Sequence, residues 1–162
     1  MSLKNVNVVN AERKKRVAIV IANPSVSTTT GWNVGFWWSE LTHPYYEFTE
    51  KGYEVEIFSP EGGRCEPDAM SDPRDPSGYS ASDLISMGFI HTPGLSSLIE
   101  STGKVADIDA DRFDAIVVAG GQAPMFTFES AVDLHRKFVE FYEKRKIAAA
   151  LCHGVSILKF AR

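Results

Sequence analysis

The sequence predicts an α/β domain with a mostly parallel sheet, and two observations lead to this fold class. Four strand-like runs, at 16–23, 53–60, 113–121 and 147–152, alternate with segments that have helical spacing. The first run, "RVAIVIAN", is rich in β-branched residues, which is typical of a strand buried on both faces of a parallel sheet. The composition, 44% hydrophobic and 23% charged among 162 residues, is that of an ordinary globular protein.

The first half of the chain divides into a lead-in, a strand and a helix. We expect residues 1–15 to be a flexible lead-in and residues 16–162 to form a single domain. Residues 36–52 have helical spacing and end in a glycine, which is a common helix stop. Because proline cannot donate a hydrogen bond inside a helix, we expect a break near Thr42–Pro44 and a main helix that begins at Pro44.

The second half contains two further predicted helices. Residues 62–94 carry several Pro and Gly between short apolar pieces, which favours an excursion over the surface. Residues 95–108 read as a short helix stopped by Gly103, and residues 130–146 as an amphipathic helix. The apolar face predicted for this second helix consists of Val132, Phe138, Val139 and Tyr142.

The last element lies close to the C-terminal end of the sequence. After the strand at 147–152, the residues from Gly154 onward begin a helix, and the sequence stops two turns later. In α/β sheets such a helix is normally covered by further strands. We therefore expect a C-terminally truncated version of a larger domain.

Charge and cysteine usage exclude several classes of function. The net charge is −4, and the only dense basic run is "RKKR" in front of the first strand, so we expect no nucleic-acid or membrane partner. No apolar segment approaches the ~18 residues of a membrane span. Two cysteines without a CxxC motif or an export signal favour free thiols in the cytoplasm. The spacing of His43, His91 and His135 predicts no metal site.

Cys152 lies at the turn between the last strand and the last helix. Such a turn exposes a side chain, and the N–H groups of the helix start favour a thiolate over the free thiol of pKa ~8.5. Gly154 matches the position of a nucleophile elbow where a side chain would clash. The alternative is a buried structural cysteine. Cys65, in a polar turn without a partner motif, is interpreted as incidental.

Two further positions are candidates for chemistry. Gly120 and Gly121 follow a buried strand, so that their N–H groups either form an oxyanion hole or belong to a plain turn. The residues that follow are not a phosphate loop, because they lack its Lys-Ser/Thr ending. Glu40 stands among aromatic residues, where it either serves the site or simply points to water. The tryptophans beside it are either core residues or a pocket wall.

Together these stretches resemble a known family. "RVAIVIAN", "GFWWSELTHPYYEFTEKGYEVEIFSPEGG", "FDAIVVAGGQAPMF" and "AAALCHG" are similar to the ThiJ/PfpI superfamily of class I glutamine amidotransferase-like proteins, nearest to its chaperone and glyoxalase III branch. The resemblance covers the chain from Arg16 onward. It implies a three-layer, flavodoxin-like sandwich.

The resemblance also implies roles for matched positions. Cys152 would be the nucleophile, His153 its neighbouring acid or base, and Glu40 a protonated carboxyl that touches the thiolate. The N–H of Gly121 and the backbone at His153 would form the oxyanion hole. The candidate site residues are thus Cys152, His153, Glu40, Gly120, Gly121, Gln122 and Gly154.

The chemistry implied is a cofactor-free conversion of 2-oxoaldehydes such as methylglyoxal to hydroxy acids, or removal of their adducts, by a homodimer. Gln122 and Ala123 replace a Gly-His pair of many members, which bears on substrate preference. The family's acidic partner of the histidine lies downstream of the elbow, so no triad acid is named here. The alternatives are a non-catalytic redox sensor or holdase chaperone, and an amidotransferase- or peptidase-like hydrolase.

Overall fold

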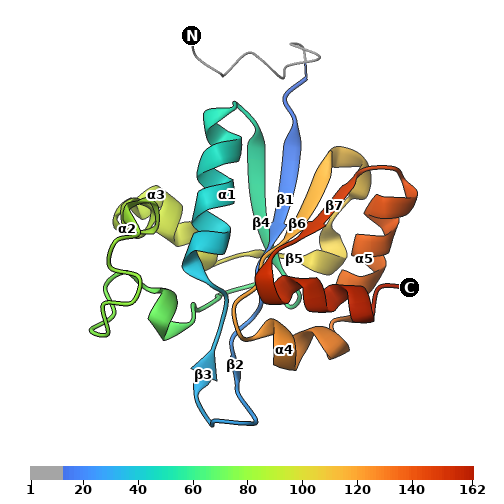
Figure 1. Cartoon of the computed structure of the whole chain (residues 1–162). Coiled ribbons are helices and arrows are strands. Elements are labelled where there is room, and N and C mark those ends of the chain that lie inside the picture. Colours follow the sequence, from blue (N-terminus) through green and yellow to red (C-terminus); the bar gives the residue numbers. More distant parts are fainter. Residues whose placement is uncertain (1–12) are drawn as a thin grey trace.

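The computed structural model describes residues 13–162, so the lead-in predicted for 1–15 lies almost wholly outside the described residues. The centre is a five-stranded sheet in the order β5-β4-β1-β6-β7, with every neighbouring pair parallel (Figure 1). A short antiparallel hairpin of β2 and β3 stands apart from it. The strands are β1 (Arg16–Val20), β2 (Ser25–Val26), β3 (Asn33–Val34), β4 (Glu54–Ser59), β5 (Gly103–Lys104), β6 (Ala115–Val118) and β7 (Ile147–Ala150).

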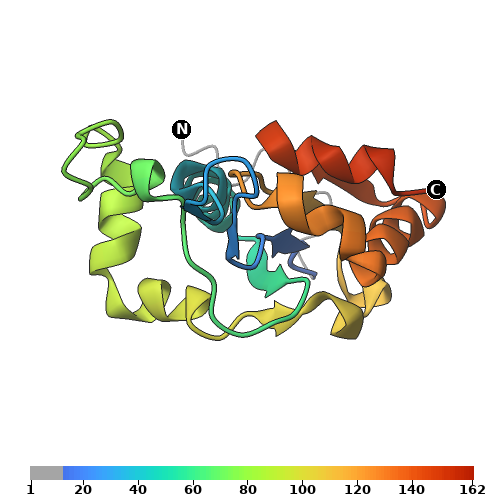
Figure 2. The ribbon, with the colours of Figure 1, turned by 90° about the horizontal axis from the view of Figure 1, so that it is seen from below.

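Helices cover both faces of this sheet. The helices α1, α2 and α3 lie on the opposite side of the molecule from α5 (Figures 1 and 2). The α-helices are α1 (Trp38–Glu50), α2 (Leu84–His91), α3 (Pro93–Ser96), α4 (Pro124–Thr127) and α5 (Val132–Glu143). The 3-10 helices are η2 (Ala69–Ser71), η3 (Ser97–Ile99), η4 (Val105–Asp107), η5 (Ala110–Arg112), η6 (Phe128–Ser130) and η7 (Cys152–Lys159).

Strand β1 explains why the sequence reads as continuously apolar. Its side chains alternate between two cores: Val17 and Ile19 belong to the core that also contains residues of α1 and α2, while Ala18 and Val20 belong to the core under α5. A strand buried on both faces has no side free for polar residues. The predicted α/β class with a mostly parallel sheet in three layers is therefore confirmed.

The predicted break in the first helix is wrong. Helix α1 runs without interruption through Pro44, which removes one hydrogen bond from its interior. The turn before the proline is held in place by the core, because the side chains of Trp38 and Leu41 are buried. Tertiary packing overrides the local preference here.

Residues 62–94 contain a helix that the sequence pattern did not reveal. Helix α2 begins after Asp83, whose side chain accepts a hydrogen bond from the backbone N–H of Ser86. The helix predicted for 95–108 is shorter than expected. It ends with η3, and Gly103 begins strand β5 instead of stopping a helix.

Two predictions about the C-terminal part need correction. The buried face of α5 consists of Leu134, Phe138 and Phe141, whereas Val132 and Tyr142 are exposed at 49% and 76%. The last helix is a 3-10 helix and begins at Cys152 rather than at Gly154. A hydrogen bond from the Gly154 N–H to the carbonyl of Leu151 starts this tighter winding.

Candidate active site

The predicted site residues meet at the carboxyl end of the sheet. Glu40 lies in the first turn of α1, Gly120–Gln122 follow β6, and Cys152 and His153 follow β7. Ligands bind at this edge of parallel α/β sheets because the strand-to-helix loops converge there. A pocket of about 680 Å³ lies among them and is lined by Thr29, Trp37, Glu40, Gly121, Gln122, Met125, Phe126, Cys152 and His153.

Cys152 has the backbone of a nucleophile elbow. Its φ of +46° lies in the left-handed region, which a residue other than glycine rarely adopts. The residue before it, Leu151, is extended, so the chain reverses sharply from β7 into η7 and leaves the cysteine exposed. Gly154 makes this reversal possible, because a Cβ there would lie 2.6 Å from the carbonyl oxygen of Val118. Backbone strain of this kind is found mostly at functional sites.

Glu40 extends from α1 toward the residues that follow β6 and β7. Its Oε2 accepts a hydrogen bond of 2.7 Å from the backbone N–H of Gly120, and its carboxyl lines the same pocket as Cys152 and raises the pKa of that thiol. Gly120 is packed tightly between them, since a Cβ there would lie 2.7 Å from the His153 nitrogen and 2.8 Å from Oε2 of Glu40. The carboxyl therefore lies inside the site and does not simply point to water.

The thiol is surrounded by influences of opposite sign. Burial raises the pKa of Cys152, and the hydrogen bond and negative charge of Glu40 raise it further. The backbone N–H groups of His153 and Gly121 lower it by hydrogen bonding to the sulfur. The net direction is upward, so the predicted low pKa of Cys152 is wrong. The reason is first the burial of the thiol and then the neighbouring Glu40, whose negative charge opposes that of a thiolate.

His153 is held by a backbone carbonyl. Its Nδ1 lies 2.9 Å from the carbonyl oxygen of Gly121. A carbonyl oxygen has no proton to give, so Nδ1 must carry the hydrogen and Nε2 is the free acceptor of the neutral ring. Gly121 has a φ of +98°, and it presents its N–H to the Cys152 side of the site and its carbonyl to the imidazole.

Sequence reasoning missed one carboxylate beside the site. Asp68 is only 2% exposed and accepts a hydrogen bond of 2.6 Å from the backbone N–H of Gln122. It lies in the segment interpreted as a surface excursion, where no pattern distinguishes it from its acidic neighbours. Of the tryptophans, Trp37 lines the pocket, Trp38 is buried in the core, and Trp32 is 67% exposed.

The second cysteine belongs to the interior. Cys65 is 1% exposed, and its sulfur lies 3.8 Å from Nδ2 of Asn23 and 3.9 Å from Oγ1 of Thr102. Burial raises its pKa, which two side-chain hydrogen bonds partly offset. The turn that carries Cys65 folds inward and packs the thiol into the core.

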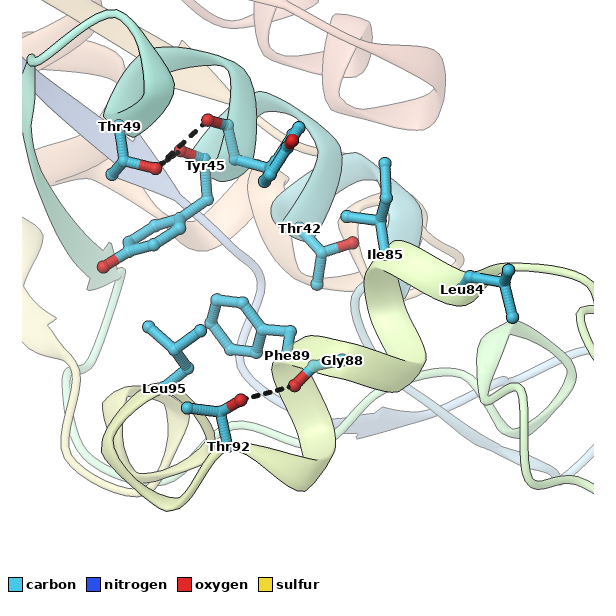
Figure 3. Close-up of a pocket in the computed structure, with 10 residues that line it drawn as sticks. Thr42, Tyr45, Thr49, Leu84, Ile85, Gly88, Phe89, Thr92 and Leu95 are labelled. Atoms are coloured by element: carbon cyan, nitrogen blue, oxygen red, sulfur yellow. Dashed lines mark hydrogen bonds between the residues drawn. The ribbon is translucent and has the colours of Figure 1, made fainter.

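A second pocket lies away from the predicted site residues. This pocket, of about 390 Å³, lies between α1 and the α2–α3 pair, with Tyr45, Phe89 and Leu95 on its walls (Figure 3). None of the predicted site residues lines it. Over residues 13–162, His, Cys, Asp and Glu side chains form no group of three or more suited to a metal ion. No helix in that range is both long and apolar enough to cross a membrane.

The chain is similar to several known proteins. A glutathione-independent glyoxalase of Schizosaccharomyces pombe, hsp3101, is 33% identical over 131 residues, covering 80% of this chain and 52% of its own. The deglycase PfpI of Pyrococcus furiosus is 31% identical over 121 residues, covering 74% of this chain and 55% of its own. In the solved structures, the Rapid Encystment Protein 24 KDa of Francisella tularensis superposes with a TM-score of 0.79 at 29% identity.

The matches cover most of this chain but only part of each relative. The chain spans about half the length of these two curated relatives. The match to the Francisella protein covers 91% of this chain and 63% of that one. The model of the DJ-1/PfpI family matches residues 33–161, which include every candidate site residue. The predicted superfamily and its glyoxalase III branch are thereby confirmed, and the chain belongs to the DJ-1/PfpI family.

Proposed function

We propose that the chain carries a glutathione-independent, glyoxalase III-type activity that converts 2-oxoaldehydes such as methylglyoxal to hydroxy acids without a cofactor. The observation that carries this proposal is that the Glu40 carboxyl and the Cys152 thiol line one pocket, together with His153 and Gly121, and that the carboxyl acts on the pKa of the thiol. The name of the fission-yeast relative supports the same activity.

The first step of the proposed reaction is attack by sulfur on the aldehyde. The thiol proton passes to the Glu40 carboxylate, and the sulfur adds to the aldehyde carbon to give a hemithioacetal. The oxygen that becomes negative is stabilised by the N–H groups of Gly121 and His153, which already point at the sulfur.

The second step moves a hydrogen between neighbouring carbons. A base removes the proton from the former aldehyde carbon, giving an enediolate, and a proton returns to the adjacent former ketone carbon. The product is a thioester of the hydroxy acid, which water hydrolyses to release the acid and the free thiol. Because Nδ1 of His153 is committed to the Gly121 carbonyl, we assign this proton transfer to Nε2.

A second candidate function uses the same residues. The Pyrococcus relative is named a deglycase, and a hemithioacetal or aminocarbinol adduct of a 2-oxoaldehyde presents the same two carbons to Cys152. The redox-sensor alternative is supported by the exposure of Cys152, since oxidation selects accessible thiols. A direct Cys-His-acid triad is less well supported, because the Nδ1 of His153 bonds to a carbonyl.

The test is turnover of methylglyoxal by the purified chain, followed by loss of the aldehyde and formation of lactate. We expect turnover in the wild type, none in Cys152→Ala, and a loss of at least about 100-fold in Glu40→Gln. Cys65→Ala is the matched control and should retain turnover, because Cys65 lies outside the pocket. Turnover that survives Cys152→Ala would refute the proposal. Oxidation of Cys152 without any turnover would favour the redox sensor. A higher rate of turnover with a preformed 2-oxoaldehyde adduct than with the free aldehyde would favour deglycation.

A further inference from the structure

Asp68 is a buried carboxylate with both oxygens occupied by backbone donors. Oδ1 accepts a hydrogen bond of 2.9 Å from the N–H of Gly35, and Oδ2 accepts one of 2.6 Å from the N–H of Gln122. A buried charge is costly unless it is hydrogen-bonded in this way. Burial raises the pKa of Asp68, while the two N–H donors and the charge of nearby His153 lower it. The carboxylate is thus fixed at the edge of the site by two backbone donors.

The connection between Asp68 and His153 runs through one peptide group. The carbonyl of Gly121 and the N–H of Gln122 are the two ends of the same peptide unit. The carbonyl end accepts a hydrogen bond from Nδ1 of His153 at 2.9 Å, and the N–H end donates to Asp68 at 2.6 Å. The imidazole, the peptide and the carboxylate therefore form a continuous chain of two hydrogen bonds.

We propose that Asp68 is a positioning residue for His153 and acts on it through the Gly121–Gln122 peptide group. A carboxylate that draws the amide hydrogen toward itself places more negative charge on the carbonyl oxygen at the other end of the peptide. This stronger acceptor holds the hydrogen of His153 on Nδ1 and leaves Nε2 free to accept a proton. In a Ser-His-Asp triad the acid does this by touching the histidine, whereas Asp68 does it across a peptide.

A purely structural role is the competing explanation, because Asp68 also ties loops together. Its backbone N–H donates to the carbonyl of Phe36 at 2.7 Å, and the neighbouring Ala123 N–H donates to the carbonyl of Gly35 at 3.0 Å. Removal of the side chain therefore loosens the pocket wall as well as the proposed relay. The test must read the imidazole itself rather than folding or turnover alone.

The experiment is a spectrum of the histidine ring nitrogens in the full chain with ¹⁵N-labelled histidine, which reports which nitrogen carries the hydrogen. In the wild type we expect neutral His153 to be in the Nδ1–H form. In Asp68→Asn, which keeps the volume but removes the charge, the ratio of Nδ1–H to Nε2–H forms should fall about 3- to 10-fold. Asp68→Glu restores the charge and should recover part of the ratio.

Asp83→Asn is the matched control, because Asp83 touches a different histidine. Its Oδ1 lies 2.8 Å from Nε2 of His43, outside the pocket that contains Cys152. This variant should change the signals of His43 and leave those of His153 as they are. An unchanged ratio for His153 in folded Asp68→Asn would overturn the proposal.

The wild-type chain decides the matter if Asp68→Asn does not fold. The short hydrogen bond to Asp68 should shift the amide proton of Gln122 well downfield of an ordinary loop amide, and His153 should be in its Nδ1–H form. Either an ordinary Gln122 shift or an Nε2–H form of His153 would refute the relay. Only one part of this proposal rests on the proposed function, namely that Nε2 of His153 acts as a base in the reaction. These spectra need no substrate, so a chain without turnover but with the expected spectra would refute the function alone.

Discussion

Gly120→Ala should damage both the stability and the site, because the added methyl group has no space. Its Cβ would lie 2.7 Å from the backbone nitrogen of His153 and 2.9 Å from that of Gly154, about 0.7 and 0.5 Å short of ordinary contact at 3.4 Å. Backbone atoms cannot turn aside as the end of a side chain can. The strand end and the elbow must therefore separate by about half an ångström, which corresponds to ~1–3 kcal/mol of overpacking.

The same separation moves the reacting groups apart. The third atom near the new methyl group is Oε2 of Glu40, at 2.8 Å, so the carboxyl must also move. A displacement of about 1 Å costs roughly 100-fold in a positioned reaction, so half of that should lower kcat/KM about 10-fold. Urea unfolding measured by tryptophan fluorescence gives the first quantity, and methylglyoxal turnover gives the second.

Gly88→Ala is the matched control for this substitution. Gly88 lies inside α2, and a Cβ there meets nothing within 4 Å. The variant should be unchanged or stabilised by ~0.5–1 kcal/mol, because alanine is the better helix former. If Gly120→Ala unfolds at the same urea concentration as Gly88→Ala and keeps full turnover, the junction of β6 with the elbow is not tightly packed.

Three further predictions concern the thiols and the open edge of the sheet. Glu40→Gln removes a negative charge that raises the pKa of Cys152. Iodoacetamide labelling of Cys152 should therefore begin at lower pH than in the wild type. An identical pH profile would show that Glu40 does not raise this pKa. Cys65 should be labelled at least about 100-fold more slowly than Cys152 in the folded protein and equally fast in denaturant, because it is 1% exposed and becomes reactive only on opening. The apolar side chains of Ile147, in the outer strand β7, and of Leu158 are 65% and 63% exposed. We propose that the chain self-associates through this surface. Leu158→Glu should lower the association constant about 10-fold in sedimentation, and an unchanged constant would exclude this surface.

The main features of the fold could be predicted because they follow from short-range patterns. The strand predicted within 16–23 is found as β1, because every position from Val17 to Ala22 faces one of two cores, which leaves an unbroken apolar run. Helix α2 could not be read in the same way. Its sequence, "LISMGFIH", has no polar face, and its start depends on the side chain of Asp83. Pro44 predicts a break that does not occur, because its helix is held by the buried Trp38 and not by local preference.

The candidate site likewise has parts that a local motif predicts and parts that only the fold brings together. Cys152 and Gly154 are separated by one residue, so a local motif is enough to place both of them at the elbow. Asp68 is 54 residues from Gln122 in the sequence, and only the fold brings its carboxylate to that N–H. The direction of the Cys152 pKa depends likewise on burial and on Glu40, which lies on helix α1, far from Cys152 in the sequence. Long-range electrostatics cannot be read from an elbow motif alone.

A raised thiol pKa is compatible with the proposed reaction, because the sulfur must act in two opposite ways. It attacks the aldehyde as a nucleophile, and a thiolate is the better nucleophile the higher its pKa. It later leaves the thioester, which a lower pKa favours. Glu40 can serve both steps by taking the proton of Cys152 before attack and returning it after hydrolysis, while the N–H groups of Gly121 and His153 remain fixed throughout. On this reasoning the carboxyl both raises the pKa of the thiol and carries its proton, which is why Glu40→Gln should react more readily with iodoacetamide and still lose its turnover of methylglyoxal.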